Sequence, residues 1–147
     1  MESGSQIIPT LALNLLTDAE AHYKQDNKFS PEILQSLHAV FGNVLIRAAE
    51  MLENASFLRY QTHNKKRQLI KVVNRSEQYT LFTNINFCHC QAFKYQVLQT
   101  RNVITCKHVL AAKLAHICGQ MKVELVTDNQ LADLLNYQYE QHGNLQT

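Results

Sequence analysis

The hydrophobic positions of the first 55 residues recur at the spacing of an α-helix. Apolar residues three and four positions apart predict a first helix near residues 6–24, with a stripe made of Ile8, Leu11, Leu15 and Ala19. Ser30 and Pro31 predict a second helix start, because a serine oxygen caps free N–H groups and proline suits the first helical position. The stripe that follows predicts one helix of about 20 residues with a wide, covered apolar face: Ile33, Leu37, Val40, Val44, Ala48 and Met51.

From Ser56 the segments become short and rich in β-branched and aromatic residues. "FLRYQT", "RQLIKVV" and "QYTLFTN" are joined by polar residues, which predicts a three-stranded antiparallel β-meander. The turn at residues 63–67, "HNKKR", holds three basic residues that are either a solvated hairpin tip or a phosphate contact. "QAFKYQVLQ" is a short helix or turn, and helices are predicted from Lys107 to Met121 and from Thr127 or Asp128 onward.

This order of elements predicts an α+β fold. We expect an N-terminal helical region at 1–55, a β-meander with its following helix at 56–126, and a C-terminal helix and tail at 127–147. A chain of 147 residues is long enough to bury one real core, so the three regions are expected to form one compact unit.

Composition and the N-terminal residues indicate whether the cysteines stay reduced. The net charge of +2 is no strong nucleic-acid signature, and no apolar run approaches the length of about 18 residues that spans a membrane. The opening "MESGSQIIPT" lacks a basic stretch followed by an apolar one, so we expect no secretory signal. Cytosolic and nuclear thiols stay reduced, and the spacing of the cysteines therefore carries the information.

Two close pairs of metal-ligand residues stand out in that spacing. Cys88-x-Cys90 is followed, after fifteen residues, by Cys106-x-His108. Three cysteines and one histidine fit a closed tetrahedral zinc site. Residues two apart on an extended strand share a face, about 6.5 Å apart along the chain, so the two sulfurs can lean together over one ion. His89, between them, is then expected to face away from the metal.

The second pair requires a different geometry. Positions two apart inside a helix point in directions about 200° apart and cannot share one ion. Cys106 is therefore expected at the cap of the helix and His108 in its first turn, where the helix dipole favours a thiolate. His116 is about 12 Å further along the axis and cannot reach that ion. Cys118 is expected to be a buried structural thiol, at helical spacing from the small residues Ala111 and Ala115.

Basic residues cluster in sequence around these pairs. With a neutral imidazole and three thiolates, the zinc site would carry a net charge of about −1, and nearby cations could offset it. The candidates are equally well explained as ordinary surface charges: Lys94, Arg101, Lys107 and Lys113.

The pattern "CHC", fifteen residues and "CKHVLA" resembles the SWIM zinc finger, in which Cys-x-Cys is followed by Cys-x-His and often by an alanine, here Ala111. The helical first half, the meander, "QAF" after Cys90 and "DNQLADLL" near the C-terminus are similar to the small SWIM-domain subunit of Shu complexes. That resemblance implies a nuclear, non-catalytic subunit with one structural Zn²⁺. It implies a hetero-oligomer with a RecA-like recombinase paralogue, which promotes homologous recombination and DNA repair by supporting recombinase filaments.

Two other function classes are weighed against this interpretation. A zinc hydrolase keeps an open coordination position, whereas four ligands are available here and no glutamate lies in either ligand segment to act as base. A finger that binds single-stranded DNA directly would use the basic turn Lys65–Arg67 and the face that carries Lys107 and Lys113, although the nearly balanced charge favours DNA contact through the complex. No glycine precedes Lys-Ser or Lys-Thr, so a nucleotide site is expected on the partner, and no membrane or small-molecule substrate is expected.

Overall fold

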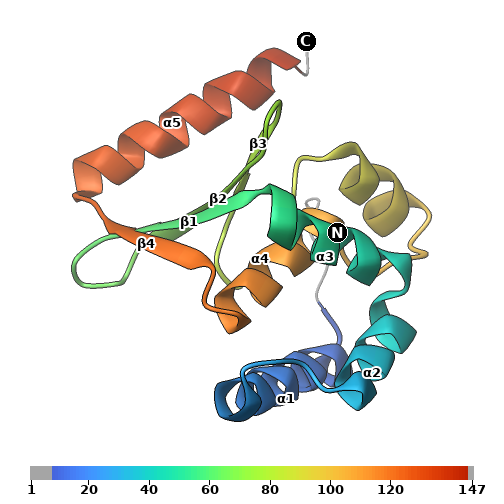
Figure 1. Ribbon diagram of the computed structural model, residues 1–147. Coiled ribbons are helices and arrows are strands. Elements are labelled where there is room, and N and C mark those ends of the chain that lie inside the picture. Colours follow the sequence, from blue (N-terminus) through green and yellow to red (C-terminus); the bar gives the residue numbers. More distant parts are fainter. Residues whose placement is uncertain (1–7, 146–147) are drawn as a thin grey trace.

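The computed structural model describes residues 8–145, and the side chains up to Tyr137. Helices and a four-stranded sheet make up the chain, so the α+β fold is confirmed. The C-terminal helix α5 (Asp128–Leu145) lies on one side of the sheet, and the other four α-helices lie on the opposite side (Figure 1).

The first two helices differ at their N-termini: a serine caps the second, and no side chain caps the first. Helix α1 (Thr10–Asp26) follows Pro9, and the part of its predicted range at residues 6 and 7 lies outside the described residues. Helix α2 spans Pro31–Phe41, and the backbone N–H of Ile33 donates to the Ser30 side-chain oxygen at 3.2 Å. The predicted serine cap is therefore confirmed.

The single helix of about 20 residues predicted after Pro31 is wrong. Gly42 divides it into α2 and α3 (Asn43–Asn54) and has φ 63° and ψ −143°, a conformation that side chains with a Cβ avoid. The hydrophobic stripe continues across the break, since Leu37 in α2 and Ala48 and Met51 in α3 are all buried. Two short helices can turn separately toward the same core, and α3 packs along α4 (Lys107–Ile117).

The predicted three-stranded meander is present, but the sheet has a fourth strand. Strands β1 (Ser56–Gln61), β2 (Gln68–Val73) and β3 (Gln78–Leu81) pair antiparallel in sequence order. Strand β4 (Met121–Leu125) then pairs parallel with β1, which gives the order β3-β2-β1-β4 and a mixed sheet.

The predicted helix end at Met121 is wrong, because strand β4 begins at that residue. Helix α4 ends at Ile117, and Gly119, with φ 76°, turns the chain back toward the sheet. Val123 and the alternating polar residues beside it suit a strand better than a further helical turn. Helix α5 starts as predicted, because Thr127 and Gln130 cap each other's backbone N–H groups at 2.9 and 3.1 Å.

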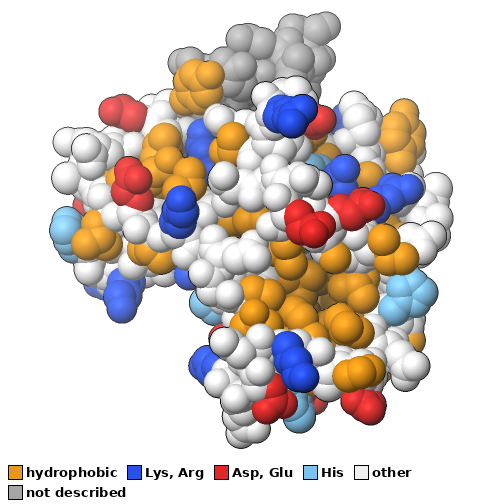
Figure 2. All heavy atoms as spheres, in the orientation of Figure 1, with side chains coloured by type: hydrophobic (Ala, Val, Ile, Leu, Met, Phe, Trp, Pro, Cys, Tyr) orange, Lys and Arg blue, Asp and Glu red, His pale blue; other side chains and the backbone are white. Residues whose placement is uncertain are grey.

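Each sheet face has its own hydrophobic partner. Phe57, Ile70 and Val72 point to the α4 side and belong to the main core. Leu69 points to the other side, where it packs with Val126 and with Leu131 of α5. Figure 2 shows hydrophobic side chains gathered on the surface over the three N-terminal helices. Among the described residues, no helix has the length and hydrophobicity to cross a membrane.

Candidate metal centre

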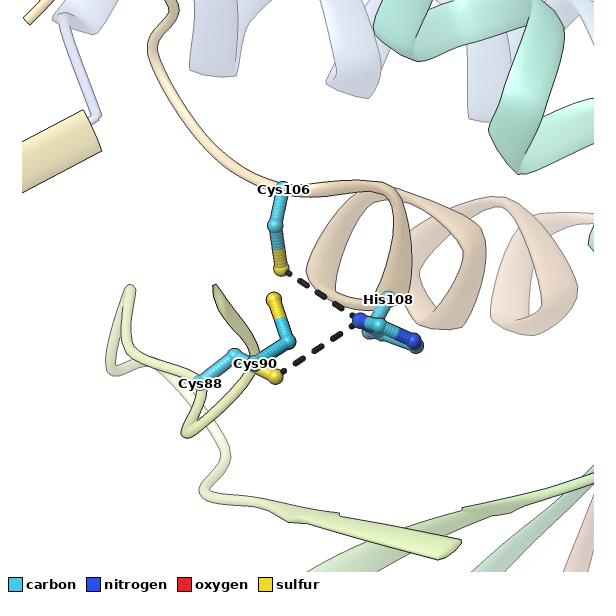
Figure 3. Close-up of side chains that lie close together, drawn as sticks. All are labelled: Cys88, Cys90, Cys106 and His108. Atoms are coloured by element: carbon cyan, nitrogen blue, oxygen red, sulfur yellow. Dashed lines mark hydrogen bonds between the residues drawn. The ribbon is translucent and has the colours of Figure 1, made fainter. Parts of the chain in front are cut away.

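Four ligand-type side chains from two separate segments meet between the sheet and α4. Cys88 and Cys90 lie in an irregular segment after β3, Cys106 is the N-cap of α4, and His108 is in its first turn. Figure 3 shows the three sulfurs and the imidazole pointing toward a common point. All four are buried, and their ligand atoms lie within 4.8 Å of one another. The structure therefore brings together all four residues selected from the sequence.

The distances within the cluster suit a tetrahedral ion. Nδ1 of His108 lies 3.7 Å from the Cys88 sulfur and 3.9 Å from the Cys106 sulfur. Zn–S near 2.3 Å and Zn–N near 2.0 Å imply an S···N edge of roughly 3.6 Å. Nδ1 is consequently the imidazole atom that faces the sulfurs, and the cluster can hold one zinc ion.

The prediction that Cys88 and Cys90 lie at a strand end is wrong, although the expected alternation is present. The ladder of β3 stops at Leu81, before the cysteine segment. Cys88 and Cys90 are nevertheless buried and His89 between them is exposed, with its ring against Phe87 at 4.9 Å between centroids. His89 therefore points away from the cluster, as the alternation predicts.

Burial and mutual hydrogen bonding shift the pKa values of the three thiols in different directions. Hydrogen bonding to Cys106 and Cys90, together with burial, raises the pKa of Cys88. Burial raises the pKa of Cys106 to about 12. Hydrogen bonds from Cys106 and Cys88 lower the pKa of Cys90, which is the favoured thiolate of the three. Three buried sulfurs need a positive charge to ionise together, and a divalent cation at their centre supplies it.

A buried pair of polar side chains ties the two ligand segments together. The Thr105 hydroxyl donates to the Asn86 side-chain oxygen at 2.5 Å, and the Asn86 amide donates to the Ile104 carbonyl at 3.1 Å. Asn86 precedes Cys88 by two residues, and Thr105 is next to Cys106. This pair was not predicted from the sequence, although the alternation that buries Cys88 also places Asn86 on the same face.

An aromatic ring covers the histidine. The ring of Tyr79 in β3 lies over the His108 ring, with centroids 4.0 Å apart. Burial and a hydrogen bond to Glu77 raise the pKa of Tyr79, so the phenol stays neutral at physiological pH. The strand next to the cysteine segment thus supports the ligand contributed by α4.

The remaining candidate residues lie away from the cluster. Nε2 of His116 is 3.5 Å from a carboxylate oxygen of Glu20. The expectation of a buried Cys118 is wrong in degree, because this thiol is half-buried at the C-cap of α4. Three of the four basic residues near the ligands in sequence are exposed, and the fourth is half-buried in a groove described below: Lys94, Arg101, Lys107 and Lys113.

The segment that holds the cluster is similar to a known type of zinc finger. Residues 81–117 match the model of the SWIM zinc finger, and they contain all four cluster residues. The chain is 28% identical over 137 residues to "Zinc finger SWIM domain-containing protein 7" of Danio rerio, covering 93% of this chain and 97% of that protein. The protein of that name from Homo sapiens is 27% identical, covering 93% and 98%.

A more distant relative shares less of the length. The Dictyostelium discoideum "Zinc finger SWIM domain-containing protein 7 homolog" is 26% identical over 71% of this chain and 67% of that protein. No solved structure matches this chain. Residues 81–117 therefore match a SWIM zinc finger and contain a four-residue cluster that can hold one zinc ion, within a chain similar over most of its length to these proteins.

Proposed function

We propose that this chain is a non-catalytic regulatory subunit of a nuclear Shu-type complex. In this proposal Cys88, Cys90, Cys106 and His108 hold one structural Zn²⁺. The folded chain binds a RecA-like recombinase paralogue and so supports recombinase filaments during homologous recombination and DNA repair. The proposal rests on the resemblance of the sequence to that subunit, and its length and finger agree with the relatives found.

The observation that carries the non-catalytic role is the closed donor set. Four protein atoms, three of them sulfurs, converge on one point, and all four residues are buried. A catalytic zinc ion usually has three protein ligands and one position for water. A tetrahedral ion with these four ligands has no such position, so its contribution is to the fold.

Direct binding of single-stranded DNA is the second candidate function. The β1–β2 turn carries Lys65, Lys66 and Arg67, and all three are exposed. Such a turn can contact phosphates, and binding of this kind weakens steeply as the salt concentration rises. Under our proposal, this turn contacts DNA only after the chain has assembled with its partner.

One experiment separates the two functions. The chain is co-expressed with the recombinase paralogue of its own organism, and the complex is isolated through a tag on the paralogue. The proposal predicts a stable complex with one zinc ion per chain, and only weak binding of a labelled oligo-thymidine strand by the chain alone. Tight, salt-sensitive DNA binding by the chain, without capture by the paralogue, would support the second function.

A further inference from the structure

A groove separates the sheet from α1 and α4, on the side of the sheet opposite α5. Figure 1 shows both helices on this side. The cavity measures about 590 Å³, and apolar and polar side chains from all three elements line it in similar numbers. Its walls include Leu13 and Leu16 of α1, Val109 and Ala112 of α4, and Ile70 and Leu81 of the sheet. Leu13 and Ile85, which also line it, remain exposed.

Two cationic side chains in this groove form no ion pair within the described residues. Arg59 of β1 and Lys113 of α4 both line it and are both half-buried. The Nε of Arg59 is buried and lacks a hydrogen-bond partner within the described part of the chain. Burial lowers the pKa of Lys113, and no carboxylate offsets that effect. A charged side chain that is partly buried and unpaired usually acquires a partner of opposite charge.

The one carboxylate that lines the groove lies near other basic side chains, one of which also lines the groove. Glu20 lies 3.5 Å from His116 and 3.9 Å from Lys24. Within the described residues, it forms no ion pair with Arg59 or Lys113. The groove thus holds two cations that form no ion pair with its own carboxylate in the described residues.

The same face of the sheet continues beyond the groove to an open edge. Val123 and Leu125 of β4 pair in register with Arg59 and Gln61 of β1, so their side chains share the face that carries Arg59. Both are exposed, with 52% and 53% of their surface accessible. β4 is an edge strand of the described sheet, and an apolar edge next to a groove is a typical protein-binding surface.

We propose that this groove is the docking site for the recombinase paralogue, an inference that rests on the proposed function. The occupant is a segment of the partner in which one carboxylate is flanked by apolar side chains. The carboxylate lies between Arg59 and Lys113, the apolar side chains enter the groove, and the segment continues over Val123 and Leu125. The apolar residues, which make up about half of the lining, favour a protein segment over a nucleic acid strand, whose phosphates would require a more polar surface.

A charge reversal in the co-expressed complex tests this site. Lys113→Glu places a negative charge opposite the expected carboxylate, and we expect at least a tenfold weaker affinity for the paralogue. Arg75→Glu, in the exposed β2–β3 turn, makes the same change in charge away from the groove and should leave the affinity unchanged. Zinc content and thermal unfolding of both variants show whether they are folded.

Zero-length cross-linking identifies the partner residue. A carbodiimide joins a lysine amine to a carboxylate in direct contact, so mass spectrometry of the wild-type complex should find Lys113 joined to an Asp or Glu of the paralogue with apolar neighbours. Reversing the charge of that residue should restore binding to the Lys113→Glu chain. Wild-type affinity in Lys113→Glu, or cross-links from Lys113 only to Glu20, would refute the docking site.

The outcomes separate this inference from the proposed function. If the paralogue does not bind the wild-type chain, both the proposed function and the docking site are wrong. If the paralogue binds wild type and folded Lys113→Glu equally, only the docking site is wrong. A wild-type dimer that Lys113→Glu dissociates would assign the groove to a second copy of the chain. Loss of oligo-thymidine binding in Lys113→Glu, with unchanged binding of the paralogue, would assign the groove to DNA. Either the dimer result or the DNA result would overturn the inference.

Discussion

The hydroxyl of Thr105 donates a hydrogen bond to the side-chain oxygen of Asn86, across 19 residues of sequence and 2.5 Å of space. Both side chains are buried. The bond fixes the segment that carries Cys88 relative to the segment that carries Cys106. The geometry of the metal cluster therefore depends on two residues that do not belong to it.

The first prediction concerns this pair. Asn86→Ala removes both of its hydrogen bonds and leaves the Thr105 hydroxyl and the Ile104 carbonyl buried without that partner, which should cost about 1–3 kcal/mol of unfolding free energy. Zinc should bind more weakly but still at one ion per chain. Thr105→Val and the double variant complete a double-mutant cycle by denaturant unfolding. Additive effects of the two substitutions would show that the bond has no energetic role.

The second prediction compares two cysteines of different exposure. Cys106→Ser removes a ligand, and we expect loss of bound zinc and of cooperative unfolding, because structural zinc contributes about 10–16 kcal/mol in small finger peptides. Cys118→Ser is the matched control and should retain one zinc ion per chain. Metal analysis and thermal unfolding measure both. A metal-free Cys106→Ser chain that unfolds like wild type would contradict a structural role for zinc.

The third prediction uses the two histidines of the finger. His89→Ala should leave the zinc content unchanged, since His89 is exposed and contacts Phe87. His108→Ala removes the Nδ1 donor and the ring beneath Tyr79, so zinc should be lost or exchange rapidly with a chelator. Chelator competition gives both rates. Rapid zinc loss from His89→Ala would mean that the alternation of this segment is not the one described.

The fourth prediction concerns Gly42 between α2 and α3. A Cβ at this position meets no atom within 4 Å, so any penalty comes from the backbone rather than from a clash. With φ at 63° and ψ at −143°, Gly42→Ala should cost about 1–3 kcal/mol. Ala39→Gly, on the exposed face of α2, is a control with an expected cost of about 1 kcal/mol. An unchanged melting temperature in Gly42→Ala would mean that the helix is continuous.

The fifth prediction is a dependence on pH. Burial lowers the pKa of Lys113 from its ordinary 10.5, so its ammonium destabilises the fold wherever it remains charged. Folding favours proton loss from this group, and the penalty disappears as the pH rises through the folded pKa toward 10.5. Lys113→Met should therefore stabilise the isolated chain at neutral pH, by an amount that shrinks as the solution becomes alkaline, while binding of the paralogue falls. A constant difference across this pH range would contradict the burial effect.

The sequence predicted those features that local spacing determines. The Ser30 cap, the meander and the four residues of the cluster follow from capping chemistry, period-two alternation and ligand spacing. Helix α3 was hidden because the hydrophobic stripe keeps its phase across Gly42, and a single glycine within a helical pattern is commonly tolerated.

The features that were missed depend on contacts between distant segments. The parallel pairing of β4 with β1 joins Phe57 to Met121, and no local pattern in either strand specifies the other. Likewise, no periodicity shows that Arg59 and Lys113 will line one groove, because the two come from different elements that meet only in the folded chain. Such pairings are set by tertiary packing.

The pairing of β4 with β1 has a consequence for how the chain is made. β1 is complete once residue 61 has been synthesised, but its neighbour on one side is not available until residue 125. The segment between them contains both ligand pairs, so metal uptake and the capture of β4 concern the same stretch of nascent chain. A cell short of zinc would accumulate chains in which β1 remains an open sheet edge, which is a template for aggregation. Zinc supply would then control the amount of this protein as well as its shape.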